Sequence, residues 1–161
     1  MWKVNLPDPA ATRAFGEALG RVAAEPVVVA LIGGLGAGKT SLAQGVGDGL
    51  GVTAAVVSPT FILVAEYPAR LPLLHADLYR IEADELLETG LEESLEGWPG
   101  VALVEWADRF PGVLPLGHLA CRLVGDVDGG REARIAATGG AANRVLVAWQ
   151  DAWHLASQAD G

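Results

Sequence analysis

A glycine-rich segment that directly follows a run of strand-forming residues constrains this chain more than any other feature. Residues 33–40 read GGLGAGKT, which fits the pattern GxxxxGK[ST], and they follow the apolar residues 27–32. In such a loop, backbone N–H groups converge on phosphate oxygens, and the following helix directs its positive N-terminus toward them. The alternative is a solvated strand-to-helix turn. Because Lys3 and Lys39 are the only lysines, a chance match is rare, and we predict a nucleotide-binding loop.

The pattern assigns chemistry to individual positions. Lys39 is expected to reach the β- and γ-phosphates of the nucleotide, and the Thr40 hydroxyl to ligate Mg²⁺. Trp106 could stack on a base, although an aromatic residue at the end of a strand also packs against the core. The predicted nucleotide-binding residues are Gly33, Gly34, Leu35, Gly36, Ala37, Gly38, Lys39, Thr40, Ser41 and Trp106.

Length and composition restrict the class of protein. With 161 residues, 51% of them hydrophobic, the chain is expected to form one domain over residues 1–156, with a frayed tail at 157–161. No uncharged apolar run approaches the roughly 20 residues that span a bilayer, and the N-terminus lacks a signal pattern, so we expect a cytoplasmic protein without a membrane partner. Cys121 is expected to be a buried thiol, and the three histidines are too scattered to predict a zinc site.

The charge of the chain argues against direct nucleic-acid binding. The formal net charge is −9, and the nine arginines are spread along the sequence. Because nucleic-acid affinity comes largely from clustered Lys and Arg, we expect no DNA binding and only indirect contact with RNA. The acidic residues between positions 82 and 96 predict a solvated helical face, with docking of a protein partner as the alternative.

The alternation of helical and extended patterns predicts an α/β fold, with a P-loop NTPase-type sheet flanked by helices and a C-terminal β-hairpin. Asp8 and Pro9 are the expected N-cap and first residue of the first helix. We expect helices at residues 8–24, 40–50, 82–96 (as one or two short helices) and 141–156, strands at 27–32, 56–57, 61–67, 71–75 and 101–104, and the hairpin at 118–124 and 131–138.

Polar residues that follow the apolar runs are the catalytic candidates, because ligands of such sheets bind beyond the carboxyl ends of the strands. Glu105 could bind Mg²⁺ through water or polarise the attacking water, or it could cap a turn. Asp77 could ligate Mg²⁺ or begin a turn. Thr60, after Pro59, could present its hydroxyl to the γ-phosphate or metal, or belong to an ordinary turn. The predicted catalytic residues are Lys39, Thr60, Asp77 and Glu105, and the predicted metal ligands are Thr40, Asp77 and Glu105.

Four motifs in series resemble the bacterial TsaE family, formerly called YjeE. They are GGLGAGKT at 33–40, SPTF at 58–61 followed by Glu66 and Tyr67, HADLYR at 75–80, and VEW at 104–106. The resemblance covers roughly residues 6–139. The sequence departs from the family at Ala76, where an aromatic residue is usual, and at residues 107–108. Neither difference affects a residue of the phosphate chemistry.

The resemblance implies a function and partners. It implies an ATP- and Mg²⁺-binding P-loop ATPase that is required for threonylcarbamoyladenosine formation at position 37 of tRNA. Such a protein acts with TsaB and TsaD, and TsaD performs the transfer. It also implies that Thr60 lies in a switch-like segment, that Asp77 is at the metal site and that Glu105 supports hydrolysis.

Two other functions use the same loop. A small-molecule kinase transfers the phosphoryl group to a bound hydroxyl, but such enzymes usually surround that group with several arginines, and Arg70, Arg80 and Arg109 are isolated in the sequence. A nucleotide-gated binding module would signal through its conformation, with incidental turnover. A GTPase is disfavoured because the sequence has no NKxD motif.

Overall fold

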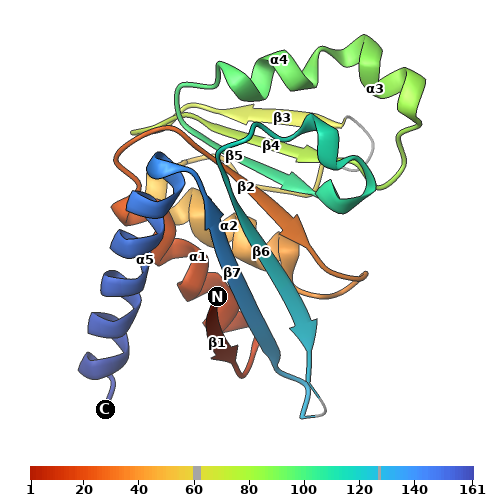
Figure 1. Cartoon of the computed structure of the whole chain (residues 1–161). Helices are drawn as coiled ribbons and strands as arrows, with labels where there is room; N and C mark the ends of the chain where they lie inside the picture. Colours follow the sequence, from red (N-terminus) through yellow and green to blue (C-terminus); the bar gives the residue numbers. More distant parts are fainter. Residues whose placement is uncertain (60–62, 127) are drawn as a thin grey trace.

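A single mixed sheet organises the chain. The computed structural model describes residues 1–59, 63–126 and 128–161, and seven strands of this part form the sheet in the order β1-β7-β6-β2-β5-β4-β3 (Figure 1). The central strands β2, β4, β5 and β6 are parallel, whereas β3, β7 and β1 add antiparallel edges. The strands are β1 (Trp2–Leu6), β2 (Val27–Ile32), β3 (Val64–Tyr67), β4 (Leu73–Asp77), β5 (Val101–Glu105), β6 (His118–Gly125) and β7 (Arg131–Thr138). This confirms the predicted α/β fold and the C-terminal hairpin.

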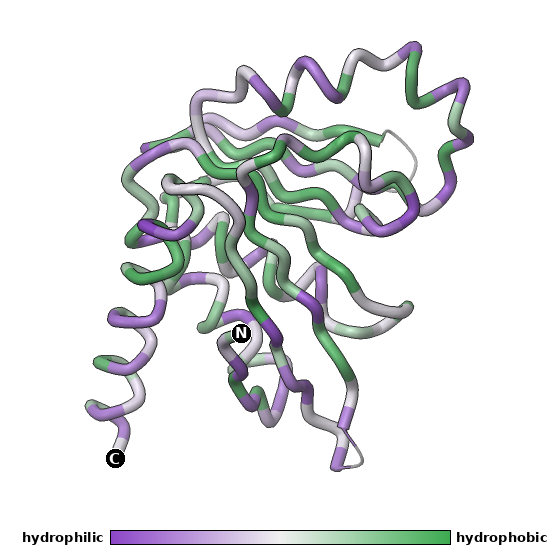
Figure 2. The backbone as a smooth tube through the Cα atoms, viewed as in Figure 1, coloured by the Kyte–Doolittle hydropathy of each residue, from purple (hydrophilic) through white to green (hydrophobic). Residues whose placement is uncertain are grey.

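Helices cover both faces of the central strands (Figure 1). Strand β2 is buried on both faces: Val29 and Leu31 pack with the long helices, and Val28 and Ala30 pack with the short ones. Figure 2 shows hydrophobic residues along the central strands of the sheet. On one face lie α1 (Pro9–Val22), α2 (Lys39–Leu50) and α5 (Gly140–Ala159), and on the other α3 (Ala83–Thr89), α4 (Leu91–Glu96) and the 3-10 turns η1 (Ala107–Arg109) and η2 (Pro111–Val113).

The carboxyl ends of the parallel strands meet at one edge of the sheet. Glu105 at the end of β5 is the register partner of both Leu31 on β2 and Asp77 on β4. The loop 33–40 leaves β2 at the same edge and leads into α2, whose first residue is Lys39. The topology alone therefore places Lys39, Asp77 and Glu105 near one another.

Helices α1 and α2 pack with their backbones in contact. A Cβ atom on Gly45 would lie 1.9 Å from the carbonyl oxygen of Arg13, and one on Gly16 would lie 2.2 Å from that of Leu42. Gly20 and Gly49, four residues further along each helix, are equally close to the opposite backbone. The absence of side chains at these glycines lets α2 lie directly against α1.

Gly45→Ala should lower the free energy of unfolding by about 2 to 4 kcal/mol, because the added methyl group overpacks this contact. The loss should appear even though alanine favours a helix interior by about 0.5 to 1 kcal/mol over glycine. Urea unfolding measures the difference. Gly112→Ala is the matched control, since no atom lies within 4 Å of its added Cβ. A Gly45→Ala variant as stable as the control would contradict the close helix contact.

Helix α5 is held against α1 by aromatic side chains. The Trp149 ring lies 4.4 Å from that of Phe15, and its Nε1 donates a hydrogen bond to the Phe15 carbonyl oxygen at 2.9 Å. Trp153, one turn later, contacts the same Phe15 ring edge-on. The segment after Gly139, to which the sequence assigned no function, thus completes the core on this face.

Several local predictions are confirmed. The Asp8 side chain accepts a hydrogen bond from the Ala11 N–H and caps α1, and Pro9 is the first helical residue. Gly51, in the left-handed region, ends α2. The acidic segment forms two short helices whose carboxylates are exposed, and no helix in the described part of the chain is long and apolar enough to cross a membrane.

Other predictions need correction. Strand β1 was not predicted, because its five residues are an edge strand that depends on pairing with β7. Residues 56–57 form no strand: Val56 packs against α2, and its carbonyl accepts a hydrogen bond from Gln44. Strand β4 is shifted two residues toward Asp77, and α5 continues to Ala159, so residues 157–159 are helical.

Candidate functional site

The loop 33–40 has the backbone conformation that its glycines predict. Gly36 and Gly38 have φ angles of +73° and +102°, which residues with a Cβ rarely adopt. The Ala37 N–H donates to the Gly34 carbonyl and closes the turn. Because α2 begins directly after Gly38, the positive end of the helix faces the loop.

The ammonium group of Lys39 lies inside this loop. Its Nζ donates hydrogen bonds to the carbonyl oxygens of Gly33 and Gly34, both at 2.7 Å, and lies 4.4 Å from the centre of the Trp106 ring. Burial lowers the pKa of Lys39 below its ordinary value, and the nearby carboxylates of Glu105, Asp77 and Asp108 oppose that shift.

Two buried carboxylates lie at the ends of β4 and β5. Asp77 is 5% exposed and Glu105 is 3% exposed. The Asp77 carboxylate accepts hydrogen bonds from the Tyr79 backbone N–H at 2.9 Å and from the Ser58 hydroxyl at 3.1 Å. These contacts fix one carboxylate beside the loop 33–40.

Glu105 is held by His75, a residue of the HADLYR motif to which the sequence assigned no role of its own. The His75 imidazole is fully buried, and its Nε2 lies 2.6 Å from Oε2 of Glu105. The spacing offered a signal: His75 and Asp77 lie two apart on one strand and so share a face, and Glu105 is the register partner of Asp77.

Two aromatic rings form a wall beside the carboxylates. The rings of Tyr79 and Trp106 are 4.7 Å apart and inclined by 32°. Trp106 has a φ angle of +59°, and its N–H donates to the Leu31 carbonyl at 3.1 Å. The backbone of Trp106 is thus bonded to the end of β2, while its ring contacts the ammonium group of Lys39.

Arg131, at the start of β7, binds backbone carbonyl groups of the loop 33–40. Its Nε donates to the Ala37 carbonyl at 2.9 Å and its Nη2 to the Gly36 carbonyl at 2.7 Å, while Nη1 binds the Gly130 carbonyl of its own turn at 2.8 Å. Arg131 belongs to no sequence motif and lies 94 residues from Ala37, so the sequence did not predict its contact with the loop.

Residues of the loop 33–40, the two buried carboxylates and the two aromatic rings line a cleft of about 500 Å³. Most of the predicted site residues lie on its wall, and Gly33 and Gly34 contribute the carbonyls that bind Lys39. Thr60 lies outside the described residues. Ser58, Tyr79 and Arg80 also line the cleft, although the sequence assigned them no role. The lining residues are Leu35, Gly36, Ala37, Gly38, Lys39, Thr40, Ser41, Ser58, Asp77, Tyr79, Arg80, Glu105 and Trp106.

The described residues include no group of three or more His, Cys, Asp or Glu side chains that could hold a metal ion. Cys121 is buried in β6, as expected, and burial raises the pKa of its thiol to about 12. A thiolate nucleophile is therefore disfavoured.

The fold and the loop sequence together define a P-loop NTPase-type α/β protein, and comparison with known proteins specifies its family. A sequence profile of the family described as "Threonylcarbamoyl adenosine biosynthesis protein TsaE" matches residues 6–133. The chain belongs to the TsaE family.

Individual relatives agree with this assignment. A Nostoc sp. protein named tRNA threonylcarbamoyladenosine biosynthesis protein TsaE is 42% identical over 139 residues, which cover 84% of this chain and 85% of the relative. The Bacillus subtilis protein of the same name is 41% identical over 138 residues, 85% of this chain and 86% of the relative. The crystal structure of Bacillus subtilis YdiB superposes with a TM-score of 0.78 at 33% identity, covering 99% of this chain and 96% of that one.

Proposed function

We propose that this chain is a Mg²⁺-dependent ATPase that serves the formation of threonylcarbamoyladenosine in tRNA and acts with TsaD and TsaB. The observation that carries the proposal is the convergence of Lys39, Asp77 and Glu105 on one cleft beside the loop 33–40. The names of the relatives support the pathway, and the chemistry of the cleft supports the reaction.

Lys39 is the residue that would neutralise the phosphates. In the structure its ammonium group binds the carbonyls of Gly33 and Gly34, so phosphate oxygens would replace these acceptors. The loop N–H groups and the N-terminus of α2 would bind the remaining phosphate oxygens. The triphosphate would then lie along the loop with its terminal group toward the two carboxylates.

Thr40 and Asp77 are the residues that fit a magnesium ion. Hydroxyl and carboxylate oxygens suit Mg²⁺, which is usually bound by one or two protein ligands together with phosphate oxygens and water. A site of this kind agrees with the absence of a three-residue metal cluster among the described residues. Bound Mg²⁺ would neutralise charge on the β- and γ-phosphates.

Glu105 is the residue that would orient the attacking water. One carboxylate oxygen is engaged by His75, and the side chain lines the cleft, so the other oxygen can accept a hydrogen bond from water. The resemblance to the TsaE family gives Glu105 the same role. Orientation of the water beside the γ-phosphate is the contribution that phosphoryl transfer to water requires.

The kinase alternative is weakened by the positions of the arginines. Arg70 donates to the carbonyls of Ala23 and Gly20, and Arg109 donates to the carbonyls of Tyr79 and Ile81. Of the three candidate arginines, only Arg80 lines the cleft. Arg70 and Arg109 therefore bind backbone carbonyl groups and are not placed to bind a transferring phosphoryl group.

Lys39→Ala should weaken ATP binding by about 1.5 to 3 kcal/mol, the range for hydrogen bonds to charged groups. Calorimetric titration with Mg·ATP measures the change, and Lys3→Ala is the matched control because Lys3 is exposed on β1. Binding by Lys39→Ala within about twofold of the control would reject the phosphate-binding role.

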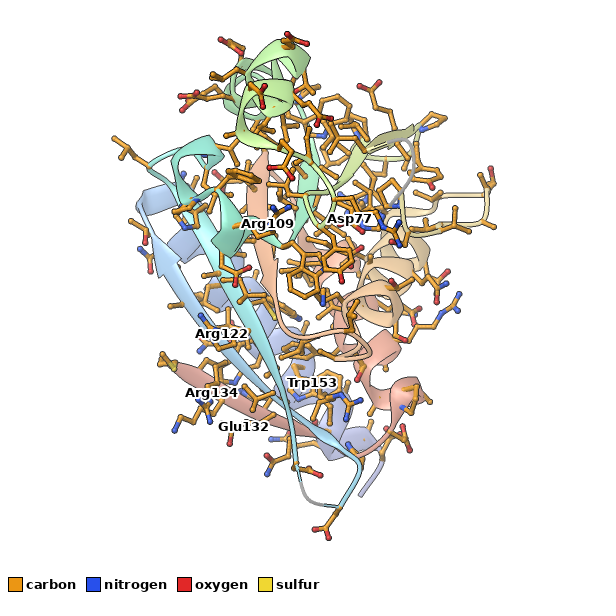
Figure 3. All side chains as sticks on the ribbon, turned by 90° about the vertical axis from the view of Figure 1, so that its right-hand side faces the viewer. Asp77, Arg109, Arg122, Glu132, Arg134 and Trp153 are labelled. Carbon is orange, nitrogen blue, oxygen red and sulfur yellow. The ribbon has the colours of Figure 1, made fainter. Side chains whose placement is uncertain are left out.

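Arg131→Ala should reduce ATP affinity by about fivefold, because the loop carbonyls of Gly36 and Ala37 lose their charged donor. Arg134→Ala is the control: Arg134 pairs with Glu132 beside Arg122, and Figure 3 shows this group apart from Asp77. The same calorimetric titration applies. Equal affinities in the two variants would show that Arg131 does not support the loop.

A further inference from the structure

His75 has an unusual environment for a core residue. It lies on β4 among buried neighbours, and its side chain has no exposed surface. Its Nε2 is 2.6 Å from Oε2 of Glu105, whereas its Nδ1 has no hydrogen-bond partner among the described residues. Burial of an imidazole with one unpaired nitrogen costs free energy, because that nitrogen loses its hydrogen bonds to water. A leucine would fill the same space without a polar atom to desolvate.

The contact fixes the tautomer of the imidazole. If the carboxyl group of Glu105 donated the hydrogen bond, Nε2 would be the acceptor, and a neutral ring would carry its proton on Nδ1. That proton would be a buried N–H without an acceptor, which is rare in folded proteins. The proton therefore belongs on Nε2, which donates to Oε2 of Glu105, and the unpaired atom is an acceptor.

This hydrogen bond determines how Glu105 faces the cleft. Oε2 is engaged by His75, and the side chain of Glu105 belongs to the cleft wall, so Oε1 is the atom left to accept a hydrogen bond from water. Without the donor, the carboxylate could rotate and lose that orientation. A misplacement of about 1 Å in a catalytic group can lower a rate about 10²-fold.

We propose that His75 is a positioning residue for hydrolysis: its Nε2–H holds the Glu105 carboxylate so that Oε1 faces the attacking water. The inference rests on the proposed ATPase function and adds the residue that orients its carboxylate. His75 contacts neither phosphate nor water in this scheme. Its role is exerted wholly through Glu105.

Two variants at position 75 separate this role from core packing. In His75→Gln the amide N–H can still donate to Glu105, whereas His75→Leu fills the space without a donor. We expect His75→Leu to lower kcat for phosphate release about tenfold with KM for ATP within about twofold, and His75→Gln to retain most of the wild-type kcat. Equal losses in both variants would overturn the proposal.

A double-mutant cycle tests whether the effect passes through Glu105. In a Glu105→Gln background, His75→Leu should change kcat by less than about twofold, because the carboxylate that His75 orients is gone. An undiminished tenfold loss in that background would assign His75 a purely structural role and overturn the proposal.

Nitrogen-15 NMR of the imidazole rings in the wild-type protein provides a readout that needs no activity and no variant at position 75. The proposal requires a protonated Nε2 on His75, and an unprotonated Nε2 would overturn it. The tautomer shows whether Nε2 of His75 is the donor of the hydrogen bond to Glu105, even if the protein releases no phosphate. Absence of phosphate release from wild type would instead reject the proposed ATPase function, so the two failures are distinguishable.

Discussion

Addition of purified TsaB and TsaD from the same organism should raise phosphate release from ATP by this chain about a thousandfold or more. The described part of the cleft offers Lys39 and Arg80 as its cations, and an arginine supplied in trans can accelerate such a reaction by about 10³ to 10⁵. Phosphate release at saturating ATP, measured with and without the two proteins, gives the factor. We expect slow turnover by the chain alone.

The exposed carboxylates of α3 and α4 are the expected docking surface for that complex. A Glu88→Lys, Glu92→Lys double variant should lose most of the stimulation while its basal rate stays unchanged. Asp151→Lys on α5 is the control, because it changes the charge of an exposed site on the other side of the sheet.

Pull-downs in ATP, in ADP and without nucleotide should show docking favoured by ATP.

Two results would contradict this part of the account. Docking that does not depend on nucleotide and does not stimulate phosphate release would contradict the expectation that ATP binding controls docking. Tight binding of tRNA by the chain alone would contradict the argument from its net charge of −9.

Glu105→Gln should slow hydrolysis about a hundredfold, since loss of a group that activates water typically costs 10²- to 10⁴-fold. Glutamine keeps the size of the side chain and removes its charge, so ATP affinity should stay within about twofold of wild type. Single-turnover phosphate release and calorimetry on the same samples measure both quantities. Glu96→Gln on the exposed face of α4 is the control. Unchanged phosphate release would reduce Glu105 to a structural residue.

The sequence predicted the features that depend on neighbouring residues. The cap of α1 at Asp8 and the end of α2 at Gly51 follow from the chemistry of single turns. Asp77 and Glu105 were predicted as candidates because each follows an apolar run, and parallel strands end at a common edge. Family motifs gave the same positions independently.

Features that depend on distant residues escaped prediction. Arg131 binds carbonyls 94 and 95 residues away, and nothing near it in the sequence indicates that contact. The contact of His75 with Glu105 depends on the register between β4 and β5, which one strand alone does not reveal. Arg109 was expected as an isolated cation, yet it holds the backbone at residues 78–81. In each case tertiary pairing supplies the partner, and a linear pattern cannot specify it.

The most direct test of the central claim is release of inorganic phosphate from ATP by the isolated wild-type chain, with Mg²⁺ and with the ion chelated. The account predicts slow, Mg²⁺-dependent formation of ADP and phosphate in equal amounts, with Lys39→Ala close to the background rate. ATP loss that phosphorylates an added acceptor without phosphate release would contradict it, as would a rate unchanged by chelation or by Lys39→Ala.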